Sequence, residues 1–326
     1  MSDLERLEAE IAEAAAPLRA AREAIGTVIV GQHGLIEGLL IALLAEGHAL
    51  LEGPPGLAKT TAVKALAATL DLTATRVQFT PDLLPADLIG TQIYDARTGE
   101  FRTRKGPLFT NLLLADEINR APAKVQSALL EAMAERQVTL GDTTHALPRP
   151  YLVLATQNPL EQEGTYPLPE AQSDRFLLKL RVDYPSRDEE IGILNRATEP
   201  PAALTAVASA DALRHAQALT RRVKVAEPLQ HYLVDIVRAT REPSTADPTL
   251  ARAIEVGASP RASLALAIGV RARAFLDGRA YALPEDVKAL APAVLRHRIQ
   301  PSYDAEADGL TADAIIARLL DRVKLR

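Results

Sequence analysis

The octapeptide Gly53-Pro54-Pro55-Gly56-Leu57-Ala58-Lys59-Thr60 constrains the fold of this chain more than any other stretch. An apolar run at residues 49–51 precedes it, and a helix-compatible run at 61–70 follows it. Strand, glycine-rich turn, Lys-Thr and helix is the order of a phosphate-binding loop, in which backbone N–H groups point at phosphate oxygens. In such a loop Lys59 reaches the β- and γ-phosphates of a nucleotide, and the Thr60 hydroxyl ligates Mg²⁺. A glycine- and proline-rich turn without a ligand is the alternative at this stage.

Ala58 departs from the strict pattern of this loop, which has glycine immediately before the lysine. A β-carbon is disfavoured where φ is positive, and glycine is the usual residue there because it has none. We therefore expect a negative φ at Ala58, the condition under which alanine fits this position.

Composition and charge narrow the class of protein. With 326 residues, 48% of them apolar and 24% charged, the chain suits two soluble globular domains. It has no cysteine, which excludes disulfides and thiolate zinc sites, and we expect a cytoplasmic protein. The longest uncharged apolar run, at residues 39–45, is too short to span a membrane. The net charge of −5 argues against a nucleic-acid surface, and the histidines show no metal-ligand spacing.

A pair of carboxylates, Asp116-Glu117, ends the apolar run at residues 112–115. A buried strand that ends in Asp-Glu is the usual partner of a phosphate loop. In that setting Asp116 would hold the Mg²⁺ shell, and Glu117 would orient and polarise the attacking water. An ordinary strand-end turn is the alternative, and the phosphate loop upstream argues against it.

The remaining pattern predicts an α/β core followed by helices. Strands expected at 75–80, 152–156 and 177–182 alternate with helices, so we expect a mostly parallel sheet with its ligand at the carboxyl ends of the strands. Turn residues between apolar and aromatic positions predict β-hairpins at about 90–105 and 138–150. Pro17 should break or kink an amphipathic N-terminal helix. Later helices are expected at 210–221, 229–241, 261–277, 285–297 and 311–323.

These motifs together resemble those of the AAA+ ATPases, and more narrowly those of the MoxR family. The resemblance covers nearly the whole chain, and the family is known for alanine at the position of Ala58. The matching stretches are 31–32, 53–60, 116–122, 155–159, 170–176 and 259–261.

The resemblance implies a P-loop AAA+ core with a five-stranded parallel sheet at residues 28–184. A helical segment at 1–27 would precede the core, and a C-terminal all-α lid domain at 185–326 would follow it. The first hairpin would be the insert in helix 2, and the second the hairpin before sensor 1. Members of the family usually assemble as hexameric rings.

The resemblance also implies roles for single residues. Asn158 would be sensor 1, Arg175 the arginine finger that reaches the γ-phosphate bound by a neighbouring subunit, and Arg261 sensor 2. A surface cation before a strand is the alternative for Arg175. The expected sets are Glu117, Lys59, Asn158, Arg175 and Arg261 for catalysis, Thr60 and Asp116 for Mg²⁺, and Val30, Gly31, Gln32, Gly53, Pro54, Pro55, Gly56, Leu57, Ala58, Lys59, Thr60, Thr61 and Arg261 for ATP.

A MoxR-type function is chaperone-like. The resemblance implies a homo-hexameric ring that couples Mg-ATP hydrolysis to remodelling, maturation, or cofactor or metal insertion of a client protein. It also implies a von Willebrand factor A-domain protein as partner.

Three alternatives stay open on the sequence. The first is a magnesium-chelatase-like ATPase subunit, which shares the helix-2 insert. The second is a DNA-acting motor, which the net charge opposes but which basic residues at the first hairpin favour (Arg97, Arg102, Arg104 and Lys105). The third is a scaffold that binds nucleotide without hydrolysis, and Glu117 and Arg175 together argue against it.

Overall fold

The computed structural model describes residues 2–54, 56–157, 166, 168–197 and 203–325. By packing, the chain divides into two compact units. The sheet unit comprises residues 17–168 and 180–214, and the helical unit comprises 1–16, 169–179 and 215–326. These units differ from the segments expected on the sequence, because 185–197 and 203–214 belong to the sheet unit and 2–16 to the helical unit. The functional boundary between core and lid stays a prediction.

Five strands form the main sheet, and the predicted fold class is confirmed. Their order is β2-β5-β8-β1-β9, so neighbouring strands of the sheet are not consecutive in the chain and are joined by crossover connections. The pairs β2–β5, β5–β8 and β1–β8 are parallel. Parallel strands covered on both faces read as continuous apolar runs, and β5 and β8 are buried up to their last residues. The strands are β1 (Ala49–Glu52), β2 (Ala74–Gln78), β5 (Leu112–Asp116), β8 (Leu152–Gln157) and β9 (Leu178–Arg181).

The register of the sheet brings the carboxyl ends of four strands level. Gln78 at the end of β2 lies beside Asp116 at the end of β5. Glu52 at the end of β1 lies beside Gln157 at the end of β8. Residues that are far apart in the chain therefore meet at one edge of the sheet, where parallel α/β sheets bind their ligands.

The N-terminal helix, α1 (Asp3–Val28), continues through Pro17, so of the predicted break or kink the break is wrong, and a kink at this proline stays a prediction. An interior proline costs about 3 kcal/mol or more, because it removes a helical hydrogen bond. Full burial of one large apolar side chain contributes about 1.5–3 kcal/mol, so several of them offset that cost. The large apolar side chains buried along α1 are Leu7, Ile11, Leu18 and Ile25.

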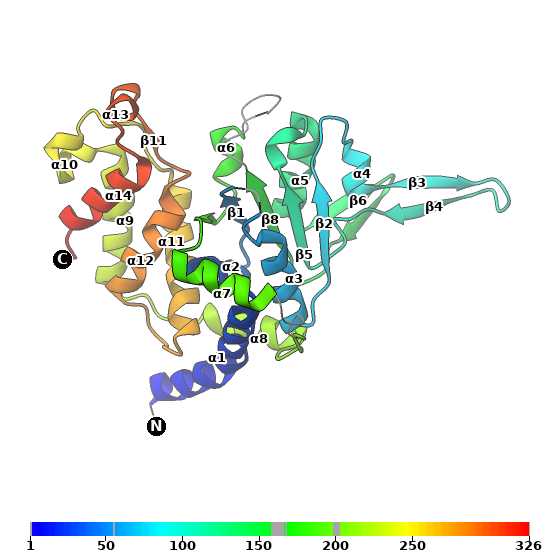
Figure 1. Cartoon of the computed structure of the whole chain (residues 1–326), viewed down its shortest axis with the longest axis horizontal. Coiled ribbons are helices and arrows are strands. Elements are labelled where there is room, and N and C mark those ends of the chain that lie inside the picture. Colours follow the sequence, from blue (N-terminus) through cyan, green and yellow to red (C-terminus); the bar gives the residue numbers. More distant parts are fainter. Residues whose placement is uncertain (1, 55, 158–165, 167, 198–202, 326) are drawn as a thin grey trace. The chain divides into compact units, whose positions relative to one another are not determined.

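Helices pack around the main sheet, and two β-hairpins form separate two-stranded sheets outside it. In the first hairpin, β3 pairs with β4 in antiparallel register, and Figure 1 shows it extending away from the sheet. The second hairpin, β6–β7, contacts the base of the first, where Gln92 donates from Nε2 to the Leu140 carbonyl at 3.5 Å. The elements are α2 (His33–Leu44), α3 (Lys59–Thr69), α4 (Pro85–Ile89), β3 (Gly90–Asp95), β4 (Glu100–Lys105), the 3₁₀ turn η1 (Ile118–Arg120), α5 (Ala123–Glu135), β6 (Gln137–Leu140) and β7 (Thr143–Ala146).

One helix of the sheet unit, α7 (Arg187–Ala197), was missed on the sequence. Ser186 and Glu189 form a reciprocal cap at its start: the Ser186 N–H donates to Glu189 Oε2 at 2.7 Å, and the Glu189 N–H donates to Ser186 Oγ at 3.4 Å. The spacing Ser-x-x-Glu was therefore the available signal.

The helical unit contains the helices expected near the C-terminus, together with a short antiparallel ladder, β10–β11, so it is not purely α. Ser259 caps α11 by accepting from the Arg261 N–H at 3.2 Å, as the pattern Ser-Pro predicts. Among the described residues, no helix combines the length and apolar content that crossing a bilayer requires. The elements are α6 (Glu170–Ser173), α9 (Glu227–Arg241), α10 (Pro243–Ala246), η2 (Pro248–Leu250), β10 (Ile254–Val256), α11 (Pro260–Leu276), α12 (Pro284–Leu295), β11 (Gln300–Pro301), α13 (Tyr303–Ala307) and α14 (Ala312–Arg322), with α8 (Ala210–Thr220) spanning the boundary at residue 215.

Candidate nucleotide-binding and hydrolysis site

The phosphate loop connects β1 to α3, as the sequence predicts. Gly53 lies so close to the next segment that a β-carbon there would approach the Val182 carbonyl oxygen to 2.3 Å, which only glycine avoids. Gly56 has a φ of +84°, in the region that favours glycine. The close approach at Gly53 and the positive φ at Gly56 thus explain why glycine occupies these two positions.

Ala58 has a φ of +55°, so the negative value expected from its β-carbon is wrong. The residue ends the loop in a left-handed turn, while its carbonyl already accepts the first helical hydrogen bond from the Ala62 N–H at 2.8 Å. A left-handed residue other than glycine costs about 1–2 kcal/mol. The turn into α3 requires this conformation, and alanine adopts it at that cost.

Lys59 folds back across the loop, with its Nζ donating to the Gly53 carbonyl at 2.5 Å. Partial burial lowers the pKa of the Lys59 ammonium below its ordinary value, and the carboxylates of Asp116, Glu117 and Glu52 oppose that shift. The side chain is therefore held inside the loop and near the carboxylates at the ends of the strands.

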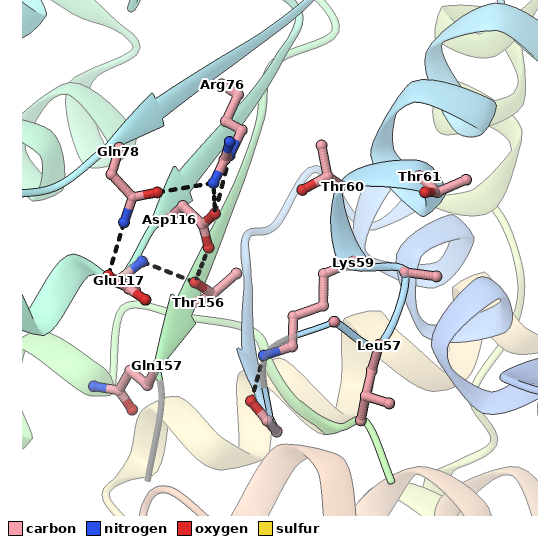
Figure 2. Close-up of a pocket in the computed structure, with 13 residues that line it drawn as sticks. Leu57, Lys59, Thr60, Thr61, Arg76, Gln78, Asp116, Glu117, Thr156 and Gln157 are labelled. Atoms are coloured by element: carbon pink, nitrogen blue, oxygen red, sulfur yellow. Dashed lines mark hydrogen bonds and ion pairs between the residues drawn. The ribbon is translucent and has the colours of Figure 1, made fainter. Parts of the chain in front are cut away.

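A cavity of about 360 Å³ lies between the loop and the strand ends. Figure 2 shows Lys59 and Thr60 on one side of it, and Asp116 and Glu117 on the other. Its lining includes Gly53, Gly56, Leu57, Ala58, Lys59, Thr60, Thr61, Arg76, Gln78, Asp116, Glu117, Thr156 and Gln157. The structure thus brings together the two motifs that the sequence places far apart.

Asp116 is bound on both carboxylate oxygens. Arg76 donates to Oδ2 from Nε at 3.0 Å and from Nη2 at 2.6 Å, and Thr156 donates to Oδ1 from Oγ1 at 2.5 Å. The Arg76 guanidinium neutralises the carboxylate that the sequence predicts as a Mg²⁺ ligand. Binding of Mg²⁺ at Asp116 would compete with this ion pair.

Glu117 is oriented by its neighbours from three elements. Its Oε2 accepts from Gln78 Nε2 at 2.7 Å and pairs with Arg120 Nε at 3.2 Å (Figure 2 shows the Gln78 contact). Its backbone N–H donates to Thr156 Oγ1 at 2.8 Å. Since Gln78 also accepts from Arg76 Nη2 at 2.8 Å, the two carboxylates belong to one hydrogen-bonded network.

The donor set in the cavity fits Mg²⁺. The Thr60 hydroxyl and the Asp116 carboxylate are hard oxygen ligands, which Mg²⁺ prefers. Among the residues that the structure describes, no cluster of three or more His, Cys, Asp or Glu side chains could hold a metal alone. Nucleotide phosphates and water would complete the shell, as is usual for Mg²⁺ in ATPases.

Several predicted site residues lie elsewhere. Gly31 packs against Glu189, and Gln32 donates from Nε2 to the Asp183 carbonyl at 2.8 Å, so Val30, Gly31 and Gln32 do not belong to the described lining of the cavity. Their expected contact with ATP stays a prediction. Of the remaining predicted residues, Pro54 is described but is not part of the cavity lining, and Pro55 and Asn158 lie outside the described residues. Arg175 and Arg261 belong to the helical unit.

Arg76, Gln78 and Thr156 were missed on the sequence as site residues. Arg76 and Gln78 are two positions apart on β2, so their side chains lie on the same face of the strand, and Gln78 is its last residue. Thr156 directly precedes Gln157 at the end of β8. Polar residues at the carboxyl end of a predicted buried strand were the available signal.

Two models of known protein families match parts of the chain. Residues 48–178 match "ATPase family associated with various cellular activities (AAA)", and residues 249–319 match "AAA lid domain". The Chaperone MoxR1 of Mycobacterium tuberculosis is 50% identical over 300 residues, which cover 91% of this chain and 79% of that protein. The chain belongs to the MoxR family of AAA+ ATPases. It is accordingly an ATP hydrolase.

Further comparisons agree with this MoxR assignment. Protein MoxR of Paracoccus denitrificans is 35% identical over 334 residues, covering 95% of this chain and 97% of that one. A crystal structure from Cytophaga hutchinsonii, of a candidate ATPase, has a TM-score of 0.92 and 45% identity over 99% of both chains. The magnesium-chelatase 38 kDa subunit of Acidiphilium rubrum is more distant, at 27% identity over 92% of this chain and 98% of that one. The MoxR proteins are thus nearer relatives than that chelatase subunit.

Proposed function

We propose that this MoxR-family ATPase is a chaperone that works as a ring of identical subunits, six by the family expectation. The ring couples Mg-ATP hydrolysis to remodelling, maturation, or cofactor or metal insertion of a client protein. A von Willebrand factor A-domain partner and a cytoplasmic location are part of the proposal. Support for chaperone work comes from the relative named Chaperone MoxR1. The structural observation that carries it is an exposed aromatic pair on the first hairpin.

Tyr94 and Phe101 face each other across the β3–β4 ladder. Their ring centroids are 5.3 Å apart, yet the two residues remain 56% and 67% exposed. Large aromatic residues bury much apolar area at low cost in conformational entropy, which makes them frequent anchors of protein interfaces. A hairpin that extends from the sheet unit and carries such a pair suits contact with a client.

Cations of the same hairpin are partly engaged within the chain. Arg102 pairs with Asp95 at 3.1 Å, and the Lys105 ammonium lies 4.7 Å from the centroid of the Phe109 ring. A surface that binds nucleic-acid phosphates needs Lys and Arg side chains that can exchange their contacts within the protein for contacts with phosphate. These contacts, together with the net charge of −5, favour a protein client over DNA.

ATPase activity measured against protein concentration tests the ring. Because Arg175 is proposed to act in a neighbouring subunit's site, turnover per subunit is expected to fall on dilution below the concentration at which subunits assemble. Added single- or double-stranded DNA is expected to leave turnover unchanged. Constant turnover per subunit, with monomers shown by light scattering, would contradict the shared site, and stimulation by DNA would favour a motor.

Replacing both hairpin aromatics, Tyr94→Ser with Phe101→Ser, is expected to abolish client maturation in cells. ATPase turnover and oligomer size should stay unchanged, since neither residue lines the cavity described above. The matched control is Ile93→Ser, because Ile93 is also exposed, to 47%, and points to the opposite face of the hairpin. If clients mature normally with the double variant, the working surface lies elsewhere, most simply on the lid.

A further inference from the structure

Asp174, the residue before Arg175, joins three parts of the helical unit. Its Oδ1 accepts from Arg298 Nε at 2.6 Å, and its Oδ2 accepts from the Ser259 hydroxyl at 2.9 Å. Arg261 Nη1 lies 3.7 Å from the same Oδ2. One carboxylate thus connects the segment that carries Arg175, the start of α11 and the residues that follow α12.

Arg298 binds the backbone on both sides of Arg175. Its Nη2 donates to the carbonyls of Asp174 at 3.1 Å and Phe176 at 2.7 Å, and its Nη1 donates to that of Leu177 at 3.2 Å. Only 3% of the Arg298 side chain is exposed. A buried guanidinium with its donors satisfied in this way is held firmly, because breaking any contact leaves a buried charge or donor unpaired.

A second buried side chain holds the same segment. His297 contacts the Phe176 carbonyl through Nε2 at 3.0 Å, and burial keeps the pKa of its imidazole well below the ordinary value, so the ring is neutral. Phe176 itself is fully buried, whereas Arg175 is exposed. The backbone around Arg175 is therefore anchored, while Arg175 itself is exposed.

From these contacts we infer that Asp174 and Arg298 are positioning residues for Arg175. The inference rests on the proposed role of Arg175 in a neighbouring subunit's site. The guanidinium of an arginine lies at the end of a long side chain, so a small shift of the backbone displaces it from the phosphate bound by the other subunit. A displacement of a catalytic group by about 1 Å can cost about 10²-fold in rate. The bond from Arg298 to Asp174, and its bonds to the carbonyls around Arg175, limit that displacement.

The Asp174 carboxylate also links Arg261 to the segment that carries Arg175. Ser259 Oγ accepts a hydrogen bond from the Arg261 N–H, and the Ser259 hydroxyl donates one to Asp174 Oδ2, so the first turn of α11 is joined to the Arg175 segment. A change in the position of Arg261 is thereby transmitted to the residue next to Arg175. The two arginines that the MoxR resemblance assigns to catalysis are not independent in this unit.

Asp174→Asn tests the inference, because it keeps the shape of the side chain and removes its charge. We expect kcat for ATP to fall about 10²-fold, as for a misplaced catalytic group, with KM little changed. Mixing with Lys59→Ala protein should restore activity, since an intact Lys59 of one subunit then meets an intact Arg175 of the other. Mixing with Arg175→Ala protein should restore none, because both defects lie on the same side of the site.

Arg298→Lys is the second variant, in case Asp174→Asn does not fold. It keeps a cation beside Asp174 but loses the fork that binds the carbonyls around Arg175, so the same loss of kcat and the same complementation are expected. The matched control is Asp286→Asn, which breaks a similarly buried pair with Arg279, at 2.7 Å, in the same unit. This control should lower the melting temperature and leave kcat unchanged.

Two results would overturn the inference. One is wild-type kcat in folded Arg298→Lys. The other is a loss of kcat that Lys59→Ala protein fails to restore while it does restore Arg175→Ala protein, which would place the defect in the subunit's own site. Failure of the proposed shared site is a separate outcome, because Arg175→Ala would then itself turn over normally or resist complementation.

Discussion

Replacing Glu117 by glutamine is expected to lower kcat for ATP hydrolysis by about 10²–10⁴-fold, the usual loss when a water-positioning base is removed. The amide keeps the size of the side chain but cannot accept a proton from water. Binding of Mg-ATP should persist, because Lys59, Thr60 and Asp116 line the same cavity and are unchanged. Turnover by a coupled assay, and binding by a fluorescent ATP analogue, measure the two effects separately.

Lys59→Ala is the matched comparison for this experiment. It removes the cation that is held within the loop, so ATP binding should be lost together with turnover. The contrast between the two variants distinguishes a group that acts on water from one that binds phosphate. Wild-type turnover in Glu117→Gln would remove the assignment of Glu117 as the base.

Arg175→Ala is expected to bind ATP almost normally and to hydrolyse it about 10³-fold more slowly or worse, the usual contribution of an arginine finger. The reason is electrostatic, since a guanidinium spreads its charge over the phosphate oxygens on which negative charge develops. Arg175 is exposed, as a residue that acts on a neighbouring subunit needs to be. Steady-state kinetics with an independent binding measurement checks the expectation.

Mixing Arg175→Ala protein with Lys59→Ala protein provides the decisive control. Each variant is expected to be nearly inactive alone, but a mixed ring would contain sites in which an intact Lys59 meets an intact Arg175, so part of the activity should return. Co-assembly must be shown, for example by pull-down of differently tagged subunits. If co-assembled mixtures regain no activity, the active site is not shared in the proposed way.

The main elements of this fold were predictable because their signals are local. The phosphate loop is a contiguous stretch, and the run at 112–115 before Asp116-Glu117 shows a strand buried on both faces by its composition alone. Parallel strands bring their carboxyl ends to one edge, so the meeting of Lys59 with Asp116 and Glu117 followed from the order of the elements. The first hairpin followed in the same way from turn residues between Tyr94 and Phe101.

The tertiary structure alone decided how the site residues are held. The positive φ of Ala58 comes from the turn that joins loop to helix, and the burial of α1 outweighs the cost of Pro17, so neither follows from local preference. The network from Arg76 through Gln78 to Glu117 depends on the register between β2 and β5.

Asp174 and Arg298 lie 124 residues apart, and no local pattern relates them. An arginine in a sequence is by default an exposed cation, and only the packing around it shows that Arg298 is desolvated and must be paired. The sequence alone therefore determined that the phosphate loop and the Asp116-Glu117 pair meet at one edge of the sheet. The tertiary structure determined which groups orient them, because long-range hydrogen bonds depend on how distant segments pack and not on the order of residues within any one of them.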